Sequence, residues 1–169
     1  MEPGQRQPVN GLHGGTRHRV LFVCLGNICR SPLAEAAFRA EAERIGLDVE
    51  ADSAGTGDWH VGQPPDPRAR ALALSKGYPI DHLRGRQLTP ADFARFTHIF
   101  ALDQQNLADI RALAPADGNA HIGLLLDEVP GRTGEAVADP YFGEDAGFET
   151  TWRDVSEAAK ALAARLAQE

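Results

Sequence analysis

The sequence contains only two cysteines in 169 residues, and no apolar run approaches the length of a membrane span. A spanning helix needs about 20 consecutive apolar residues, so membrane insertion is not expected. The two cysteines stand too close together in the chain to staple a secreted fold. Positive charge is also scarce, with 17 Lys and Arg against 24 Asp and Glu and a net charge of −7. This balance argues against a nucleic-acid partner.

Residues 1–18 contain four glycines, two prolines and few apolar residues. They lack the apolar core of a secretory signal, so we expect a cytoplasmic protein. We predict that residues 1–18 are a disordered leader or an expression remnant, in which His13 and His18 have no role. Residues 19–169 are then long enough for a single domain with its own core. The abundance of Ala, Arg and Gly suggests a bacterial source.

Strand-like and helix-like segments alternate along the rest of the chain. The apolar pattern predicts strands over 19–23, 49–54, 96–102 and 121–126, and helices over 31–45, 66–76, 104–113 and 148–167. Gly46 and Gly77 are placed to end the first two helices. The alternation predicts an α/β fold: a three-layer sandwich with a four-stranded parallel sheet and helices on both faces. Ligands of such folds bind beyond the carboxyl ends of the strands.

The segment Cys24–Ser31, with the sequence CLGNICRS, lies at such a point, between a predicted strand and a predicted helix. Loop N–H groups and a helix N-terminus bind anions and favour a thiolate over a thiol. Arg30 can hold an oxyanion with its planar fork. A lone cysteine is usually a small buried hydrophobe. The arginine six positions on and the following serine instead predict a phosphate-ester pocket with Cys24 as its nucleophile.

Three further residues of this loop each have two interpretations. Ser31 suits the N-cap of the helix, and it could also donate a hydrogen bond to the Cys24 thiolate. Asn27 is a good left-handed turn residue, and its amide could brace the loop against Ser53. Cys29 could pack under the loop, or it could trap an oxidised Cys24 as a disulfide. The sequence leaves both alternatives open for Cys29.

Dephosphorylation by a thiolate also requires a proton donor for the leaving oxygen. Asp139 is the candidate, because it precedes Pro140, which restricts it to extended backbone, and two aromatic residues follow. Trp59 stands in a glycine-rich loop, where we expect it to be partly exposed and able to stack on an aromatic substrate. Asp103 suits the N-cap of the helix over 104–113, and it could also act on the site through hydrogen bonds.

Together with Ser53–Thr56 (SAGT), Asp58–His60 (DWH) and Asp139–Gly143 (DPYFG), the loop motif resembles the low-molecular-weight protein tyrosine phosphatases over residues 19–169. The resemblance implies hydrolysis of phosphotyrosine monoesters through a phosphocysteine intermediate. Cys24 would be the nucleophile, Arg30 the phosphate clamp, and Asp139 the general acid and then the general base. It implies no cofactor and no catalytic metal. Phosphotyrosine proteins, bacterial tyrosine kinases among them, would be partners, and phosphate and other oxyanions would be ligands or inhibitors.

The resemblance also implies a substrate-binding set and a supporting set. Substrate contacts would come from Leu25, Gly26, Asn27, Ile28, Cys29, Ser31, Trp59, Tyr141 and Phe142. Supporting roles would fall to Ser53, Asp103 and a histidine for which His82 is the nearest match, although its spacing is one residue longer than in some members. Tyr141-Phe142 also departs from the two tyrosines of many members, which keeps the aromatic wall but removes one hydroxyl.

Three other functions fit parts of the pattern. An arsenate reductase needs further cysteines to relay a disulfide, and none follows Cys29. Phosphoarginine phosphatases resemble this family but tend to carry Thr where Ile28 stands, and the apolar Ile28 favours an aromatic ester. A non-catalytic phosphate-binding module would need the pocket but neither the Cys24 thiolate nor Asp139. A phosphatase therefore accounts for most of the motifs.

Overall fold

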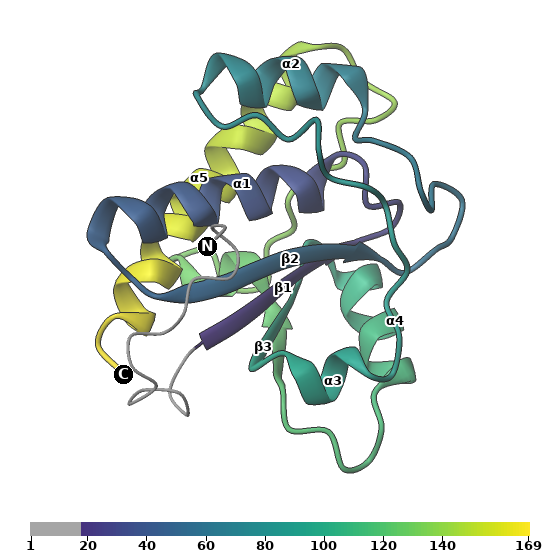
Figure 1. The fold of residues 1–169 in the computed structure, drawn as a ribbon, viewed down its shortest axis with the longest axis vertical. Helices are drawn as coiled ribbons and strands as arrows, with labels where there is room; N and C mark the ends of the chain where they lie inside the picture. The colour runs from purple at the N-terminus through teal and green to yellow at the C-terminus, as the bar shows by residue number, and fades with distance from the viewer. Residues whose placement is uncertain (1–17) are drawn as a thin grey trace.

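The computed structural model describes residues 18–169 and shows a four-stranded parallel sheet with the order β2-β1-β3-β4 (Figure 1). The strands are β1 (His18–Cys24), β2 (Val49–Gly55), β3 (His98–Ala101) and β4 (His121–Leu124). The helices are α1 (Arg30–Ile45), α2 (Pro67–Ser75), α3 (Asp92–Arg95), α4 (Gln104–Leu113), the 3₁₀-helix η4 (Leu125–Glu128) and α5 (Ala146–Leu166).

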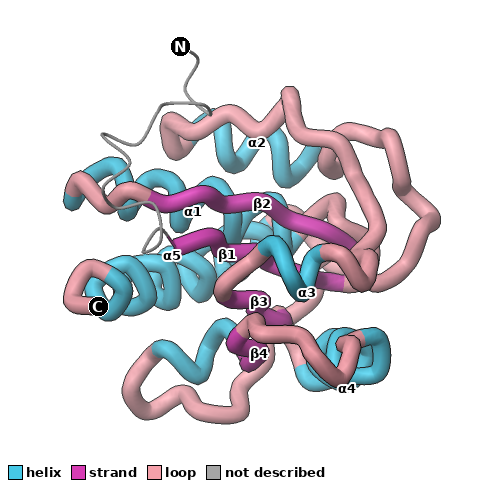
Figure 2. The backbone as a smooth tube through the Cα atoms, turned by 60° about the horizontal axis from the view of Figure 1, so that its bottom comes forward, coloured by secondary structure: helices cyan, strands magenta, loops and turns pink. Residues whose placement is uncertain are grey.

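Helices cover both faces of the sheet, as Figure 2 shows, so the predicted three-layer α/β sandwich is confirmed. Along β1, Val20 and Phe22 belong to the core formed with α1 and α5. Leu21 and Val23 belong to a second core with residues of α3 and α4. This alternation follows from the two-residue period of a strand. Because β1 is buried on both faces, it is apolar at every central position, as is typical of a parallel sheet.

Helix ends follow the signals in the sequence. Gly46 has a φ of 72° and adopts the left-handed conformation that ends α1, as predicted. Gly77 likewise has a φ of 91° and follows Lys76, the C-cap of α2. Asp66 is the N-cap of α2, and Asp103 is the N-cap of α4, where its carboxylate accepts a hydrogen bond from Asn106 N at 2.7 Å. Within residues 18–169, no helix combines the length and apolarity that a bilayer crossing requires.

Several predicted boundaries were wrong. His18, assigned to the leader, is the first residue of β1, and the rest of the predicted leader lies outside the described residues. β3 is confined to residues 98–101 rather than 96–102. β4 ends at Leu124, and the predicted strand residues 125 and 126 instead begin η4. The 3₁₀ turn buries both of these leucines, which a continued strand would point to opposite faces.

The sequence analysis also missed α3. This helix has only four residues, which is too short for a helical period to emerge from the apolar pattern. Its start is fixed locally, because the Asp92 carboxylate accepts hydrogen bonds from Thr89 N and from the Arg86 guanidinium. The short helix leads the chain into β3 and places Phe93 and Phe96 in the second core.

Candidate active site

The loop that follows β1 is held against the end of β2. Cys24 O accepts a hydrogen bond from Thr56 N at 2.9 Å, and Leu25 O accepts one from Gly57 N at 3.0 Å. The approach is so close that a Cβ on Gly55 would lie 2.8 Å from Leu25 O. Glycine is therefore required at the end of β2 for the loop to sit where it does. The serine-alanine-glycine-threonine motif is thus the support of the cysteine loop.

Asn27 is the internal brace of this loop. It has a φ of 59° and is buried, with an exposed fraction of 4 %. Its Nδ2 donates to Ser31 Oγ at 2.8 Å and to Ser53 Oγ at 3.1 Å. Its Oδ1 accepts from Arg86 N at 2.9 Å. Both the left-handed turn and the contact with Ser53 that the sequence suggested are present, whereas the contact with Arg86 was not foreseen.

Cys24 Sγ receives two hydrogen bonds from its own loop. Asn27 N donates to it at 3.3 Å, and Ser31 Oγ lies 3.1 Å away. Ser31 Oγ already accepts from Asn27 Nδ2, and its other possible acceptor, Ala54 O, is more distant at 3.5 Å. The single hydroxyl proton of Ser31 is therefore best donated to the sulfur. This arrangement stabilises a thiolate.

The alternative role of Ser31 as a helix N-cap was wrong. Helix α1 begins at Arg30, so Ser31 lies inside its first turn, and the N-cap position belongs to Cys29 without a capping side chain. The hydroxyl of Ser31 is turned back toward Cys24 and Asn27 instead. The polar side chains of the loop thus form hydrogen bonds with one another rather than with the N–H groups at the start of α1.

Cys29 is a different kind of thiol. It is buried, with an exposed fraction of 3 %, and burial together with the negative charges of Asp66 and Cys24 raises its pKa far above the usual value. A thiol in this environment stays protonated. Both cysteines are free in the structure, and a disulfide between Cys29 and an oxidised Cys24 stays an open alternative. The structure therefore distinguishes two cysteines that the sequence places in one motif.

The Arg30 side chain, nearly fully buried, is fixed along one edge. Its Nη1 donates to Asp103 Oδ2 at 2.7 Å and to Val137 O at 3.0 Å, which uses both of its hydrogens. Nη2 lies 3.5 Å from Asp139 Oδ2. Burial alone would lower the pKa of Arg30, but the negative charge of Cys24 and the hydrogen bond to Asp103 raise it above its usual value. The cation is thus secured, and its Nε–Nη2 edge remains available.

Asp139 is oriented by its own turn. Its Oδ1 accepts a hydrogen bond from Tyr141 N at 3.1 Å, which leaves Oδ2 on the side of Arg30. The segment before it is tied to the sheet, because Val137 N donates to Leu102 O at 2.8 Å. The Asp139 side chain is 38 % exposed. The carboxyl group therefore stands at the entrance of the site rather than in the core.

Arg68, at the start of α2, anchors the far side of the acid loop. Its Nη2 donates to Tyr141 O at 2.9 Å and its Nη1 to Gly143 O at 3.3 Å. Asp66 accepts from Arg68 Nε and Nη2, both at 3.0 Å, and the guanidinium lies 4.7 Å from the centroid of the Phe148 ring. Burial would raise the pKa of Asp66, but the hydrogen bonds from Arg68 hold it below its usual value. Sequence reasoning missed Arg68, whose partners lie far along the chain.

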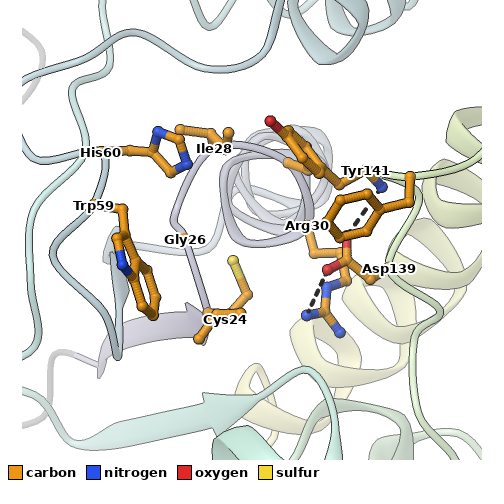
Figure 3. A pocket seen from close by; sticks show the side chains of 11 residues that line it. Cys24, Gly26, Ile28, Arg30, Trp59, His60, Asp139 and Tyr141 are labelled. Carbon is orange, nitrogen blue, oxygen red and sulfur yellow. Dashed lines mark hydrogen bonds and ion pairs between the residues drawn. The ribbon is translucent and has the colours of Figure 1, made fainter.

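These groups surround one cavity of about 150 Å³ (Figure 3). Cys24 points its sulfur into the cavity, with Trp59 and His60 on one side and Arg30 and Asp139 on the other. Trp59 is 65 % exposed, as the sequence predicted. The full lining consists of Cys24, Leu25, Gly26, Ile28, Cys29, Arg30, Trp59, His60, Asp139, Tyr141 and Phe142. The walls of this cavity are mainly apolar.

The predicted supporting residues fall in different places. Ser53 and Asp103 contact Asn27 and Arg30 directly. His82 does not line the cavity above the sulfur, and it is exposed beside a separate small cavity next to α1. The structure therefore does not bring His82 to the site. His60 does line the cavity, and its position in the Asp-Trp-His motif was the signal that could have found it.

Comparison with known proteins agrees with this geometry. The family described as low molecular weight phosphotyrosine protein phosphatase matches residues 19–169. A low molecular weight protein-tyrosine-phosphatase of Streptomyces coelicolor is 45% identical over 157 residues, covering 90% of this chain and 95% of that protein.

Two solved structures are similar over most of their length. The crystal structure of YfkJ from Bacillus subtilis has a TM-score of 0.83 and 38% identity, covering 90% of this chain and 96% of that one. The structure of DARP, a Drosophila arginine phosphatase, has a TM-score of 0.81 and 33% identity, covering 86% of this chain and 96% of that one. Bacteria and a fly both supply relatives, so the similarity does not establish the bacterial source that the composition suggested. The chain belongs to the low molecular weight phosphotyrosine protein phosphatase family, a family of phosphoric monoester hydrolases.

Proposed function

We propose that the protein hydrolyses phosphotyrosine monoesters in proteins through a phosphocysteine intermediate on Cys24. The observation that carries the proposal is the environment of the Cys24 sulfur. It accepts hydrogen bonds from Asn27 N and Ser31 Oγ, and it faces a cavity that also holds Arg30 and Asp139. Cys29 has neither hydrogen bond within residues 18–169, and burial raises its pKa. One thiol is therefore prepared for attack, and the other is not.

The phosphoryl group would be held by two sets of donors. The N–H groups of Gly26, Ile28 and Cys29 have no acceptor within residues 18–169, so they are available to an oxyanion in the loop. The Nε–Nη2 edge of Arg30 is the second set, since Nη1 is already occupied. An Nε–Nη2 pair matches two phosphate oxygens in a planar fork. Such donors stabilise the charge that the equatorial oxygens carry in the transition state.

In the first step, Cys24 Sγ attacks phosphorus, and the bond from phosphorus to the tyrosyl oxygen breaks. Asp139 in its acid form gives its proton to the leaving phenolate. Asp139 lies at the cavity entrance, where that oxygen would depart. Phosphate binding to Arg30 Nη2 would compete with the 3.5 Å contact from Asp139 and free the carboxyl group for this task. The products of the step are a phosphocysteine and a neutral tyrosine.

In the second step, the Asp139 carboxylate takes a proton from water, whose oxygen attacks phosphorus. The sulfur–phosphorus bond breaks, and inorganic phosphate leaves. Ser31 Oγ, 3.1 Å from the sulfur, donates its proton in a hydrogen bond to the departing thiolate and so makes it a better leaving group. The same network that prepares Cys24 for attack therefore also assists its release.

The walls of the cavity favour an aromatic ester. Trp59 and Tyr141 flank the sulfur, and Ile28 contributes an apolar edge rather than a hydroxyl. An aromatic ring gains both burial and stacking between such walls. A guanidinium leaving group, as in phosphoarginine, would lose hydration between these apolar walls, and Ile28 has no hydroxyl to accept a hydrogen bond from it. We therefore propose phosphotyrosine as the substrate class; the kinase partner and the cytoplasmic location stay predictions.

A phosphopeptide panel tests this proposal. Matched peptides carrying phosphotyrosine, phosphoserine or phosphoarginine are incubated with the enzyme, and phosphate release is measured. We expect turnover of the phosphotyrosine peptide and none with Cys24→Ser. Asp139→Asn should lower kcat by about 10² to 10⁴ while leaving KM little changed. Faster release from phosphoarginine than from phosphotyrosine would overturn the assignment of substrate class.

Acid quenching during turnover supplies an independent test of the intermediate. Peptide mapping by mass spectrometry should find one phosphoryl group on Cys24, and Cys29→Ser should retain it as the matched control. A phosphoryl group on Cys29, or turnover by Cys24→Ser, would contradict the mechanism. Asp139→Asn should accumulate less of the intermediate with phenyl phosphate than with p-nitrophenyl phosphate, because the better leaving group needs less help from an acid.

A further inference from the structure

Three histidines gather at the amino ends of the strands, away from the active site. β1 begins at His18 and ends at Cys24, so about six strand rises, roughly 20 Å, separate this edge from the sulfur. His98 begins β3, and His121 begins β4. The proposed phosphatase mechanism uses none of them. Three imidazoles on neighbouring strands therefore need an explanation of their own.

The strand register places all three side chains on one face of the sheet. His98 pairs with His121 on β4 and with Val20 on β1. His18 precedes Val20 by two residues, so it shares the face of Val20. The ring centroids lie 5.8 Å apart for His18 and His98, and 5.7 Å apart for His98 and His121. This is the face covered by α5, whose C-terminal end brings Glu169 to the same place.

His18, His98 and Glu169 present their ligand atoms to a common point. One nitrogen of each imidazole and one carboxylate oxygen all lie within 4.8 Å of one another. Ligand atoms of a tetrahedral zinc ion lie about 3.4 Å apart when the metal–nitrogen distance is about 2.0–2.1 Å. Side-chain rotations that move each atom by about an ångström close that gap. Two imidazoles and one carboxylate are also a common donor set for zinc.

A second observation fixes which nitrogen of His98 is free to bind. Its Nδ1 lies 2.8 Å from Thr97 Oγ1. That hydroxyl also lies 2.9 Å from Arg19 O and accepts from Arg19 N at 2.9 Å. Its single proton is used toward Arg19 O, so His98 Nδ1–H is the donor to Thr97. The lone pair of His98 is then on Nε2, and the hydrogen bond to Thr97 orients the ring as outer partners of metal-bound histidines do.

The geometry points to a binding site for a divalent transition metal ion, of which Zn²⁺ is the representative, formed by His18, His98 and Glu169. Water would complete the coordination. Glu169 keeps one oxygen for the metal, because the bond to Arg165 uses the other. The charge of Arg165 opposes a cation nearby, but Glu128 also pairs with that guanidinium through two hydrogen bonds. The ion would tie the end of α5 to β1 and β3.

Zinc titration tests the site in the full chain. The Cys24→Ser variant is used throughout, so that zinc cannot bind the active-site thiolate. After treatment with EDTA and its removal, calorimetric titration with Zn²⁺ should give one saturable site. Zinc at about 100 times its dissociation constant should raise the unfolding temperature by roughly 5–10 °C, whereas Mg²⁺ should not. EDTA should reverse the shift.

Three variants decide whether these residues are the ligands. His98→Phe, His18→Gln and Glu169→Gln should each weaken zinc binding at least tenfold, while His82→Gln, an exposed histidine elsewhere, should not. If His98→Phe fails to fold, His18→Gln and Glu169→Gln still decide whether the site exists. Equal zinc affinity in His18→Gln and Glu169→Gln and their parent overturns the site. A loss of affinity in His82→Gln or His13→Gln alone also overturns it, because zinc would then bind elsewhere.

Discussion

Asn27 offers the most stringent test of how the cysteine loop is held together. Asn27→Ala removes the bonds from Nδ2 to Ser31 and Ser53 and the bond from Arg86 N to Oδ1. Each such bond contributes about 1 kcal/mol, so the three together account for about 3 kcal/mol. Alanine at a φ of 59° adds about 1 kcal/mol of backbone strain. The variant should therefore be destabilised by roughly 3–5 kcal/mol.

Urea unfolding measures this loss directly. The midpoint should fall while the slope stays constant, since the buried surface is little changed. Asn27→Gly is the matched control, because it removes the same side chain but adopts positive φ without a Cβ penalty. It should be less destabilised than Asn27→Ala by about 0.5–1 kcal/mol. The turnover of p-nitrophenyl phosphate should fall about tenfold or more in both variants, since Ser31 loses the donor that orients its hydroxyl.

A destabilisation below about 1 kcal/mol in Asn27→Ala would refute this reasoning, because even one lost buried bond accounts for that much. So would equal stability of the alanine and glycine variants, which would show that the left-handed turn is not strained. Normal turnover in a variant with the expected loss of stability would separate the folding role of Asn27 from its role at the sulfur.

Three other predictions concern different parts of the molecule. Arg68→Ala should lower kcat about tenfold, because the loop that carries the general acid Asp139 loses its anchor. The loss should be larger for phenyl phosphate than for p-nitrophenyl phosphate, and Arg68→Lys should recover only part of it. Equal losses for the two esters would exclude a role of Arg68 in positioning the acid. Trp59→Ala should raise KM for a phosphotyrosine peptide several-fold without changing inhibition by inorganic phosphate, whereas Val61→Ala, exposed on the same loop outside the cavity, should change neither. In EDTA, stability should fall as the pH drops from about 6.5 toward 4, since burial lowers the pKa of His98 from 6.5 to about 4 and the unfolded chain therefore binds its proton first. Urea midpoints measured across this pH range should show the loss of stability, and the loss should be smaller in His98→Phe. An identical pH dependence in that variant would show that His98 is not the titrating group responsible.

The sequence by itself determined the order of strands and helices and the location of the nucleophile. These features depend on residues close together in the chain. The two-residue alternation of apolar side chains, Gly46 at the end of α1 and the cap at Asp103 each act within a few positions. The loop Cys24–Ser31 is likewise one continuous segment, so its anion-binding character can be read before any tertiary contact is known. Short elements such as α3 and η4 were not predicted, because four residues are too few to show a helical repeat of apolar side chains.

Only the tertiary structure decided how the parts of the site are joined. Arg30 meets Asp103 and Val137 across 73 and 107 residues, and Arg68 reaches Tyr141 across 73. No local pattern encodes such pairs, because the fold determines which loop ends lie together at the edge of the sheet. The same holds for His18 and His98, which become neighbours only through the register of β1 and β3. Burial, a property of the folded chain, also separates the protonated thiol of Cys29 from the hydrogen-bonded sulfur of Cys24.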